Sequence, residues 1–474
     1  MKPFQTLLVL LIVAVLCVAI MLFFPKSGIR ISESITLKFK SWSDLTDTIS
    51  SKPLIENVET FLAAQDSVMD TLQINRQQSI TSLQFADGNS AALFPFFESL
   101  ERAAQGERIH VLHYGDSQIE SDRMTSLLRS KWQEMFGGSG PGLIAPVPIT
   151  ASAAISQSCS PNFKRYTAYG FDDGKINHNQ FGVMASFGRF TSPLDASQIN
   201  PSDTAVGWLE FRPSGMSSAS CRKFSKATMW FGHHKFPIEV ELWLNDSLLD
   251  KSAFQPTQEV IERTWRFGGP ASKVRWVFKG PDSPDIQAIS FEGASGVFVD
   301  NIALRGSSGT IFKKINASEL GQQMTSLNAT LILLQFGGNS VPYTSSVTQA
   351  NDYGSFFQSQ IQQLKRLNPK ASFIVIGPSD MSTSVDGVYQ TWPYLEAIRD
   401  AMKKAAFNEG CAFWDMYSVM GGRNSMISWV TNNPPYAGPD YTHFTPLGAR
   451  RVAELLFKSI QKEYDAWKTA KSSL

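Results

Sequence analysis

An apolar stretch that ends in Gly115-Asp116-Ser117 limits the possible folds of this chain more than any other feature. The residues from Ile109 to Tyr114 are mostly apolar, which is typical of a strand buried in a parallel sheet. Ser121-Asp122-Arg123 then predicts the start of a helix. A serine between such a strand and a helix lies where open α/β sheets bind ligands, and the neighbouring backbone N–H groups can stabilise a developing oxyanion.

Two later stretches also place glycine or polar residues directly before a helix or after a strand. The stretch from Leu331 to Gln335 predicts a buried strand, and it leads into Gly337-Gly338-Asn339. Near the C-terminus, the stretch from Asp440 to His443 precedes a predicted helix, with Thr445 as its N-cap and Pro446 in its first turn.

Strands and helices alternate through the C-terminal half of the chain. Strands are predicted at 331–335 and 373–377, and helices at 356–367 and 393–406. This alternation predicts an α/β fold in which a parallel sheet is sandwiched between helices.

The order of these motifs resembles the SGNH (GDSL-type) hydrolase family. That family has a Gly-Asp-Ser block, a glycine block, a Gly-x-Asn block and a final Asp-x-x-His block. The glycine block has its counterpart in the stretch from Asp300 to Gly309. The resemblance covers residues 105–140 and 295–465, and it implies a flavodoxin-like parallel sheet and ester hydrolysis through an acyl-serine intermediate.

Acyl transfer needs a nucleophile, a base and a group that orients the base. Ser117 is the expected nucleophile by its position. His443 is the best candidate base among the six histidines, and Asp440 can accept a hydrogen bond from its other ring nitrogen. In isolation, His443 is better explained as a loop residue that caps the next helix, but its pairing with the other blocks favours the catalytic role.

The resemblance also implies three donors for an oxyanion hole. These are the N–H groups of Ser117 and Gly306 and the side-chain amide of Asn339. Gly142 and Gly309 are rivals for the glycine position, but the segment before Gly306 has the pattern of a strand.

Two further residues are candidates for substrate binding. Gln118 follows the serine where many members of the family have leucine, which suits a polar substrate. Asp380 follows a predicted strand on the same edge of the sheet, where it can contact substrate or brace a turn. No cysteine or histidine cluster has metal-ligand spacing, and the glycine runs lack a nucleotide-binding context, so we expect neither metal nor cofactor.

The segment from 150 to 295 has short alternating runs separated by turns, such as the one from Ile238 to Trp243. We expect an inserted β-sandwich domain between the first and second strands of the hydrolase sheet. Some peptidoglycan O-acetylesterases of the SGNH family carry a carbohydrate-binding-like β domain at this point. Most tryptophans of this segment are expected in its core and one or two on its surface as a sugar platform: Trp208, Trp230, Trp243, Trp265 and Trp276.

Four cysteines are too few for a disulfide framework. Cys159 and Cys221 both fall in the predicted insert. They either pair in an oxidising compartment or remain two buried thiols.

The run from Leu7 to Phe24 is apolar throughout and is long enough to span a bilayer. No small-residue cleavage site follows it, so we expect an uncleaved membrane anchor. The predicted organisation is an anchor over 1–26, a stalk over 27–90, a hydrolase domain over 91–149 and 296–474, and the β insert over 150–295. The hydrolase domain is expected outside the cytoplasm, in the periplasm.

The expected function is removal of O-acetyl groups from an envelope polysaccharide, either peptidoglycan or an exopolysaccharide. An O-acetyltransferase with the same three residues, or a non-catalytic protein that binds cell-wall glycan, are the alternatives. With 43 basic and 42 acidic residues, the chain gives no reason to expect nucleic acid as a partner. Its oligomeric state is left open.

Overall fold

The computed structural model describes residues 29–30, 36–37, 82–170 and 174–473. Residues 1–77 form a unit of their own, whose described part is a two-stranded antiparallel sheet of β1 (Ile29–Arg30) and β2 (Thr36–Leu37). The predicted anchor and most of the predicted stalk lie outside the described residues. Among the helices that are described, none combines the length and apolar character needed to cross a bilayer.

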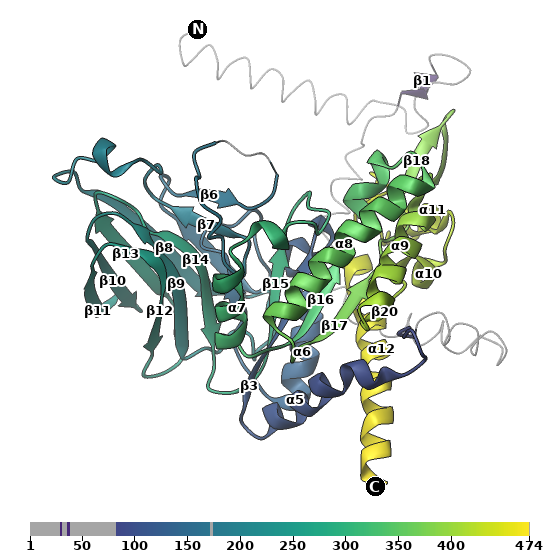
Figure 1. Ribbon diagram of the computed structural model, residues 1–474, viewed down its shortest axis with the longest axis horizontal. Coiled ribbons are helices and arrows are strands. Elements are labelled where there is room, and N and C mark those ends of the chain that lie inside the picture. The colour runs from purple at the N-terminus through teal and green to yellow at the C-terminus, as the bar shows by residue number, and fades with distance from the viewer. Residues whose placement is uncertain (1–28, 31–35, 38–81, 171–173, 474) are drawn as a thin grey trace. The chain divides into compact units, whose positions relative to one another are not determined.

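Residues 78–474 form one compact unit built on a five-stranded parallel sheet (Figure 1). Its order is β15-β3-β16-β17-β20, which is 2-1-3-4-5 when the strands are numbered along the chain. This is the flavodoxin-like order that the family resemblance implied. The bounds are β3 (Arg108–Gly115), β15 (Gly296–Ala303), β16 (Ala329–Gln335), β17 (Ser372–Ile376) and β20 (Ala412–Trp414).

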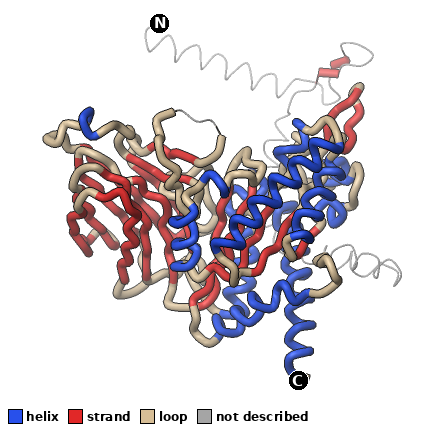
Figure 2. Tube along the Cα trace, viewed as in Figure 1, coloured by secondary structure: helices blue, strands red, loops and turns tan. Residues whose placement is uncertain are grey.

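Helices cover both faces of this sheet (Figure 2). Side chains alternate along β3, so that Leu112 and Tyr114 share one core with the first group of helices, while Ile109 and Val111 share another with the second. The first group is α7 (Ala317–Ser326), α8 (Val347–Leu367) and α9 (Leu395–Asn408). The second group is α5 (Phe94–Ala104), α6 (Thr125–Phe136), α10 (Met416–Met420), α11 (Ser425–Thr431) and α12 (Pro446–Ser472).

The helix after the serine begins later than the sequence predicts. A 3-10 helix, η2 (Ser117–Asp122), comes first, and Ser121 within it has a φ of 59° that breaks the helical path. The Asp122 carboxylate is bound by the Arg129 guanidinium of α6 at 2.6 and 3.0 Å. At α12 the prediction is confirmed, because the Thr445 hydroxyl accepts the N–H of Gly448 at 3.2 Å.

Between β3 and β15 the chain forms two antiparallel sheets that pack on a shared apolar core. This is the sandwich arrangement that the sequence predicts. One sheet contains, in order, β11 (Ser247–Phe254), β10 (Ile238–Leu244), β13 (Val274–Gly280), β8 (Ala205–Pro213) and β5 (Ile155–Cys159). The other contains β12 (Thr257–Arg266), β9 (Lys226–His234), β14 (Asp285–Glu292), β7 (Ser186–Arg189) and β6 (Lys164–Thr167), with β4 (Gly142–Ile144) paired to β14.

The two ends of this β region lie side by side. The N–H of Gly293 donates to the Ser139 carbonyl at 2.7 Å, and that of Val297 donates to Gly137 at 3.0 Å. The sandwich is nevertheless packed into the α/β part, since some of its apolar side chains share a core with the sheet and α7. These shared residues include Met184, Phe187 and Trp230 on one side and Tyr114, Phe312 and Leu320 on the other. The exact domain boundaries stay a prediction.

Cys159 and Cys221 are free thiols in the structure, so the possible disulfide is absent. Cys221 is buried, and burial raises the pKa of its thiol. Of the five tryptophans of the β region, Trp208 and Trp243 are half-buried and the other three belong to cores. Arg275 lies over the Trp208 ring at 4.6 Å from its centroid, so this surface is already partly covered.

The remaining elements are short. A hairpin is formed by β18 (Ser382–Val385) and β19 (Val388–Thr391). The other 3-10 helices are η1 (Ser90–Leu93), η3 (Ala196–Gln198), η4 (Phe312–Lys314) and η5 (Gly338–Tyr343).

Candidate active site

The structure brings Ser117, His443 and Asp440 together at the carboxyl edge of the parallel sheet. The Ser117 Oγ atom lies 2.9 Å from His443 Nε2, and His443 Nδ1 lies 2.7 Å from Asp440 Oδ2. We call these three residues the triad. Both distances are hydrogen-bond distances, so each ring nitrogen of the imidazole faces one partner.

Ser117 lies two residues after the end of β3. Strand order reverses between β3 and β16, which makes this the switch point where open α/β sheets form their ligand crevice. The Asp116 carboxylate accepts the N–H of Gln118 at 2.9 Å and so braces the turn. Burial raises the pKa of this carboxyl group to about 6, although hydrogen bonds from Gln118 and Asn339 act in the opposite direction.

The loop before α12 is shaped to hold His443 against Ser117. The Asp440 Oδ1 atom accepts the N–H groups of Thr442 at 3.1 Å and of His443 at 3.0 Å, which folds the loop over the carboxylate. Burial alone raises the pKa of Asp440, but the hydrogen bonds from the His443 ring and from these two N–H groups outweigh burial, and the pKa is lowered. Asp440 is therefore ionised at neutral pH and can fix the tautomer of the imidazole.

Two side chains join the serine turn to the histidine loop. The Gln118 amide donates from Nε2 to the Thr442 carbonyl at 2.6 Å and accepts the N–H of Phe444 at 3.3 Å. Arg123 donates to the carbonyl groups of Ser117 at 2.6 Å and Phe444 at 3.0 Å. Sequence reasoning missed both roles, because the loop they contact lies more than three hundred residues away in the chain.

A cavity of about 240 Å³ opens beside the triad. Ser117, His443 and Asn339 line it, together with Tyr343 and Trp392. Tyr343 is 86% exposed, so its ring stands at the mouth of the cavity and is available to a ligand. A small acyl group fits a space of this size.

The predicted oxyanion donors differ in their contacts, since Asn339 already forms hydrogen bonds and Gly306 has open space beside it. Asn339 lines the cavity, and its Nδ2 atom donates to Asp116 Oδ2 and to the Ser307 carbonyl, both at 3.2 Å. Donation to an oxyanion therefore requires that one of these contacts is given up. Gly306 has a φ of 77° and open space where a Cβ would lie, while a Cβ on its rival Gly309 would meet the Phe336 ring at 2.6 Å. The roles of all three predicted donors stay predictions.

Two expectations about substrate binding do not fit the structure. The Gln118 side chain lines the cavity, but both of its polar atoms are used by the histidine loop, so it acts on the protein and not on a ligand. Asp380 is fully buried, and its carboxylate accepts hydrogen bonds from the Thr391 hydroxyl at 2.8 Å and the Met426 N–H at 2.7 Å. It braces the turns on which these residues lie, which was the alternative for this residue.

Comparison with protein families gives one match. Residues 285–451 match the model of the GDSL-like Lipase/Acylhydrolase family. The match begins in β14 and includes Gly306, Asn339 and both members of the triad on the C-terminal loop. Ser117 lies outside it, because the β region separates the first strand of the sheet from the rest. Comparison with curated proteins gives no match.

Among solved structures, a peptidoglycan O-acetylesterase is similar at 21% identity with a TM-score of 0.60. The similarity covers 81% of this chain and 99% of that one, so the two share a fold. A family two carbohydrate esterase from Clostridium thermocellum, solved with cellohexaose, is 9% identical over 64% of this chain and 98% of its own. Its TM-score of 0.25 is too low to indicate a common overall fold.

Proposed function

We propose that this chain, an ester hydrolase of the SGNH type, removes O-acetyl groups from an envelope polysaccharide through an acyl-serine intermediate. The observation that carries the proposal is the hydrogen-bonded chain from Ser117 through His443 to Asp440, at 2.9 and 2.7 Å. A serine, a histidine and an aspartate hydrogen-bonded in this order have one main chemical use, which is to activate the serine for attack on an acyl carbonyl.

In the first half of the reaction, Ser117 Oγ attacks the acetyl carbonyl while His443 Nε2 takes its proton. The Asp440 carboxylate stabilises the imidazolium that forms. The oxyanion is held by the N–H groups of Ser117 and Gly306 and by the Asn339 amide. When the intermediate collapses, the C–O bond to the sugar breaks, and His443 returns the proton to the leaving hydroxyl. Water then hydrolyses the acetyl-serine by the same steps, which releases acetate.

The form of the cavity supports a short acyl group on a hydroxyl-rich ligand. Its volume of about 240 Å³ leaves little room for a long acyl chain. The exposed Tyr343 ring at its mouth and the half-buried Trp392 ring offer faces on which a sugar can stack. The shared fold with a peptidoglycan O-acetylesterase, almost all of which this chain covers, favours peptidoglycan first and an exported glycan second.

The proposal includes a location outside the cytoplasm. The apolar run from Leu7 to Phe24 would tether the enzyme to the membrane, and the reaction needs no cytosolic cofactor. Release of the full chain from membranes by detergent but not by high salt would support this tether. Recovery of the protein in the soluble fraction without detergent would contradict it.

The function is tested by measuring acetate released from purified O-acetylated peptidoglycan. The expected result is acetate release by the native protein and none by Ser117→Ala. Hydrolysis of medium-chain aryl esters is measured beside it, since a preference for these with no acetate from any glycan would indicate a lipase-like esterase instead. Mass spectrometry of the glycan products with an added sugar acceptor separates hydrolysis from acetyl transfer.

A further inference from the structure

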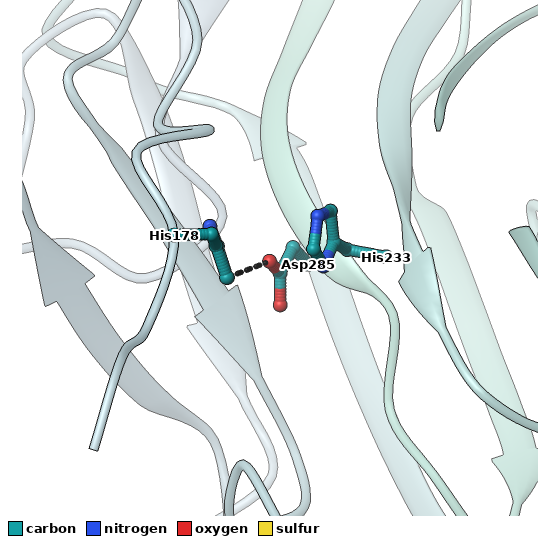
Figure 3. A group of neighbouring side chains, drawn as sticks. All are labelled: His178, His233 and Asp285. Atoms are coloured by element: carbon teal, nitrogen blue, oxygen red, sulfur yellow. Dashed lines mark ion pairs between the residues drawn. The ribbon is translucent and has the colours of Figure 1, made fainter. Parts of the chain in front are cut away.

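Three side chains from distant parts of the β region lie close together (Figure 3). His178 lies in the loop between β6 and β7, His233 lies near the end of β9, and Asp285 begins β14. One ring nitrogen of each histidine and one carboxylate oxygen all lie within 4.8 Å of one another. Linear spacing could not reveal this group, because its members are more than fifty residues apart along the chain.

One carboxylate oxygen of Asp285 lacks a hydrogen bond. Asp285 is 1% exposed, and its Oδ1 atom accepts a hydrogen bond from the Arg189 guanidinium at 2.6 Å. Its other oxygen, Oδ2, is buried and accepts no hydrogen bond in the described structure, although His178 Nε2 lies 3.1 Å from it. A buried carboxylate oxygen without a hydrogen bond is costly, so the site favours a ligand that binds this atom.

The two imidazoles suit the same ligand. Their rings stack with centroids 4.1 Å apart, and both side chains are half-buried. Each ring places one nitrogen within the group, and a neutral imidazole nitrogen is a common metal ligand. An ion pair between His178 and Asp285 alone would leave the second ring without a role.

The charged side chains around the group favour a bound cation. Arg189 is shared by Asp282 at 2.5 Å and Asp285 at 2.6 Å, so two carboxylates face one guanidinium. By holding Oδ1, Arg189 orients the carboxylate and leaves Oδ2 for a ligand, which is the usual arrangement around a metal-bound carboxylate.

We propose that His178, His233 and Asp285 bind one divalent transition-metal ion of the zinc type. Two imidazole nitrogens and one carboxylate oxygen are a common ligand set for such ions. Bonds of about 2.1 Å in a tetrahedral site require ligand atoms about 3.4 Å apart, which small side-chain rotations from the observed positions can provide. Three protein ligands leave one position for water.

The role of the ion follows from what the His178 loop contacts next. The N–H of Gly182 donates to Glu319 Oε1 at 2.9 Å, and that of Val183 donates to Gln323 Oε1 at 2.7 Å, both on α7. An ion bound by His178, β9 and β14 therefore fixes the loop between β6 and β7, which is the loop that contacts α7. None of its ligands lines the catalytic cavity, so the proposed role of the ion is to hold this loop and not to take part in ester hydrolysis.

The test uses the untagged full chain, purified with detergent and dialysed against a chelator. Zn²⁺ and Co²⁺ are titrated separately by calorimetry, and bound metal is measured after gel filtration. We expect one ion per chain, a visible-range Co²⁺ absorption typical of four or five ligands, and a melting temperature raised by about 3 °C or more. His178→Gln and His233→Gln should each weaken binding at least about 100-fold and remove the shift in melting temperature.

His443→Gln is the matched control, since it removes a histidine of the triad and should bind metal as the native chain does. Circular dichroism of the metal-free variants checks that they fold. A native chain that binds neither ion, or His178 and His233 variants that bind with native affinity, would overturn the proposal. Loss of binding in His443→Gln alone would place the ion at the triad and would also overturn it.

Discussion

Gln118 and Thr442 are joined by a hydrogen bond of 2.6 Å from the side-chain amide of the first to the carbonyl of the second. Each of them is the direct neighbour of a reacting residue, because Gln118 follows Ser117 and Thr442 precedes His443. The oxygen of the same amide accepts the N–H of Phe444 at 3.3 Å, so Gln118 forms hydrogen bonds to the residues on both sides of His443. This contact sets the distance between nucleophile and base.

Replacement of Gln118 should therefore slow the chemical step without weakening substrate binding. We expect Gln118→Ala to lower kcat on a small acetyl ester about 10- to 100-fold with KM within about threefold of the native value, since small misplacements of reacting groups cost rate. Gln157→Ala is the control, because its amide also donates to backbone carbonyl groups, those of Ala145 at 2.7 Å and Pro146 at 2.6 Å, but does not line the catalytic cavity. A rise in KM with unchanged kcat would show that Gln118 binds substrate directly.

Replacement of the nucleophile should abolish turnover. Ser117→Ala is expected to lower kcat on a small acetyl ester by about 10⁴-fold or more, because the loss of a triad member removes the covalent route. Ser121→Ala is the matched control in the same 3-10 helix, since its hydroxyl contacts Thr150 at 3.3 Å and not the triad. Retention of a tenth of native activity by Ser117→Ala would contradict the assignment.

The parts of the site that the sequence predicts are those set by local pattern. A buried strand that ends in Gly115-Asp116-Ser117 places the serine at the sheet edge, and Asp440 and His443 lie on one short loop. Both features depend on neighbours in the chain, and the structure places them as expected. The strand order followed from the family resemblance. The β sandwich was predictable because alternation and turn signals repeat along its segment.

Contacts between distant segments were not predictable in the same way. Gln118 was expected to face the substrate, yet its amide meets a loop that only the closed fold brings near. Asp380 follows a strand on the active-site edge, but the α11 segment covers it and supplies the Met426 N–H. A single sequence shows which side chains are polar, and the fold decides whether protein or ligand takes their hydrogen bonds.

The packing of the β region indicates that the α/β part needs it to stay soluble. Phe187 and Trp230 share a core with Tyr114 and Leu320, so deletion would expose apolar surface on the sheet and α7. We expect a chain lacking 150–295 to be recovered mainly as aggregate, whereas the full chain is monodisperse in gel filtration. A soluble deletion protein that hydrolyses small esters at the native rate would contradict this expectation.

Glu319 should make the stability of the fold depend on pH. Burial raises the pKa of its carboxyl group to about 7, against hydrogen bonds from Gln287 and the Gly182 N–H that lower it. The folded state therefore holds this proton where the unfolded state has lost it. The stabilisation is fully present below the unfolded pKa, near 4.5, and is lost as pH rises through about 7.

Glu319→Gln keeps the acceptor oxygen and removes the titration. We expect the free energy of unfolding of the native chain to fall relative to this variant between pH 4.5 and 7, by up to about 3 kcal/mol at about 1.4 kcal/mol per pH unit. Urea unfolding at several pH values measures the difference, and Glu98→Gln on the exposed face of α5 serves as control. Parallel pH profiles for native chain and Glu319→Gln would mean that the carboxyl group stays ionised when folded.

Replacement of Tyr343 should weaken binding of the polymeric substrate but not of a small ester. Its ring is 86% exposed at the mouth of the catalytic cavity, where the flat face of an aromatic ring can stack on a sugar of the polymer. We expect Tyr343→Ala to raise KM for O-acetylated peptidoglycan about three- to tenfold while kcat and the kinetics on a small acetyl ester stay near native. Phe356→Ala on α8 is the matched control, because that ring is 63% exposed but does not line the cavity. Equal losses on polymer and small ester would mean that Tyr343 supports the triad itself, and no change on either would remove it from the glycan-binding surface.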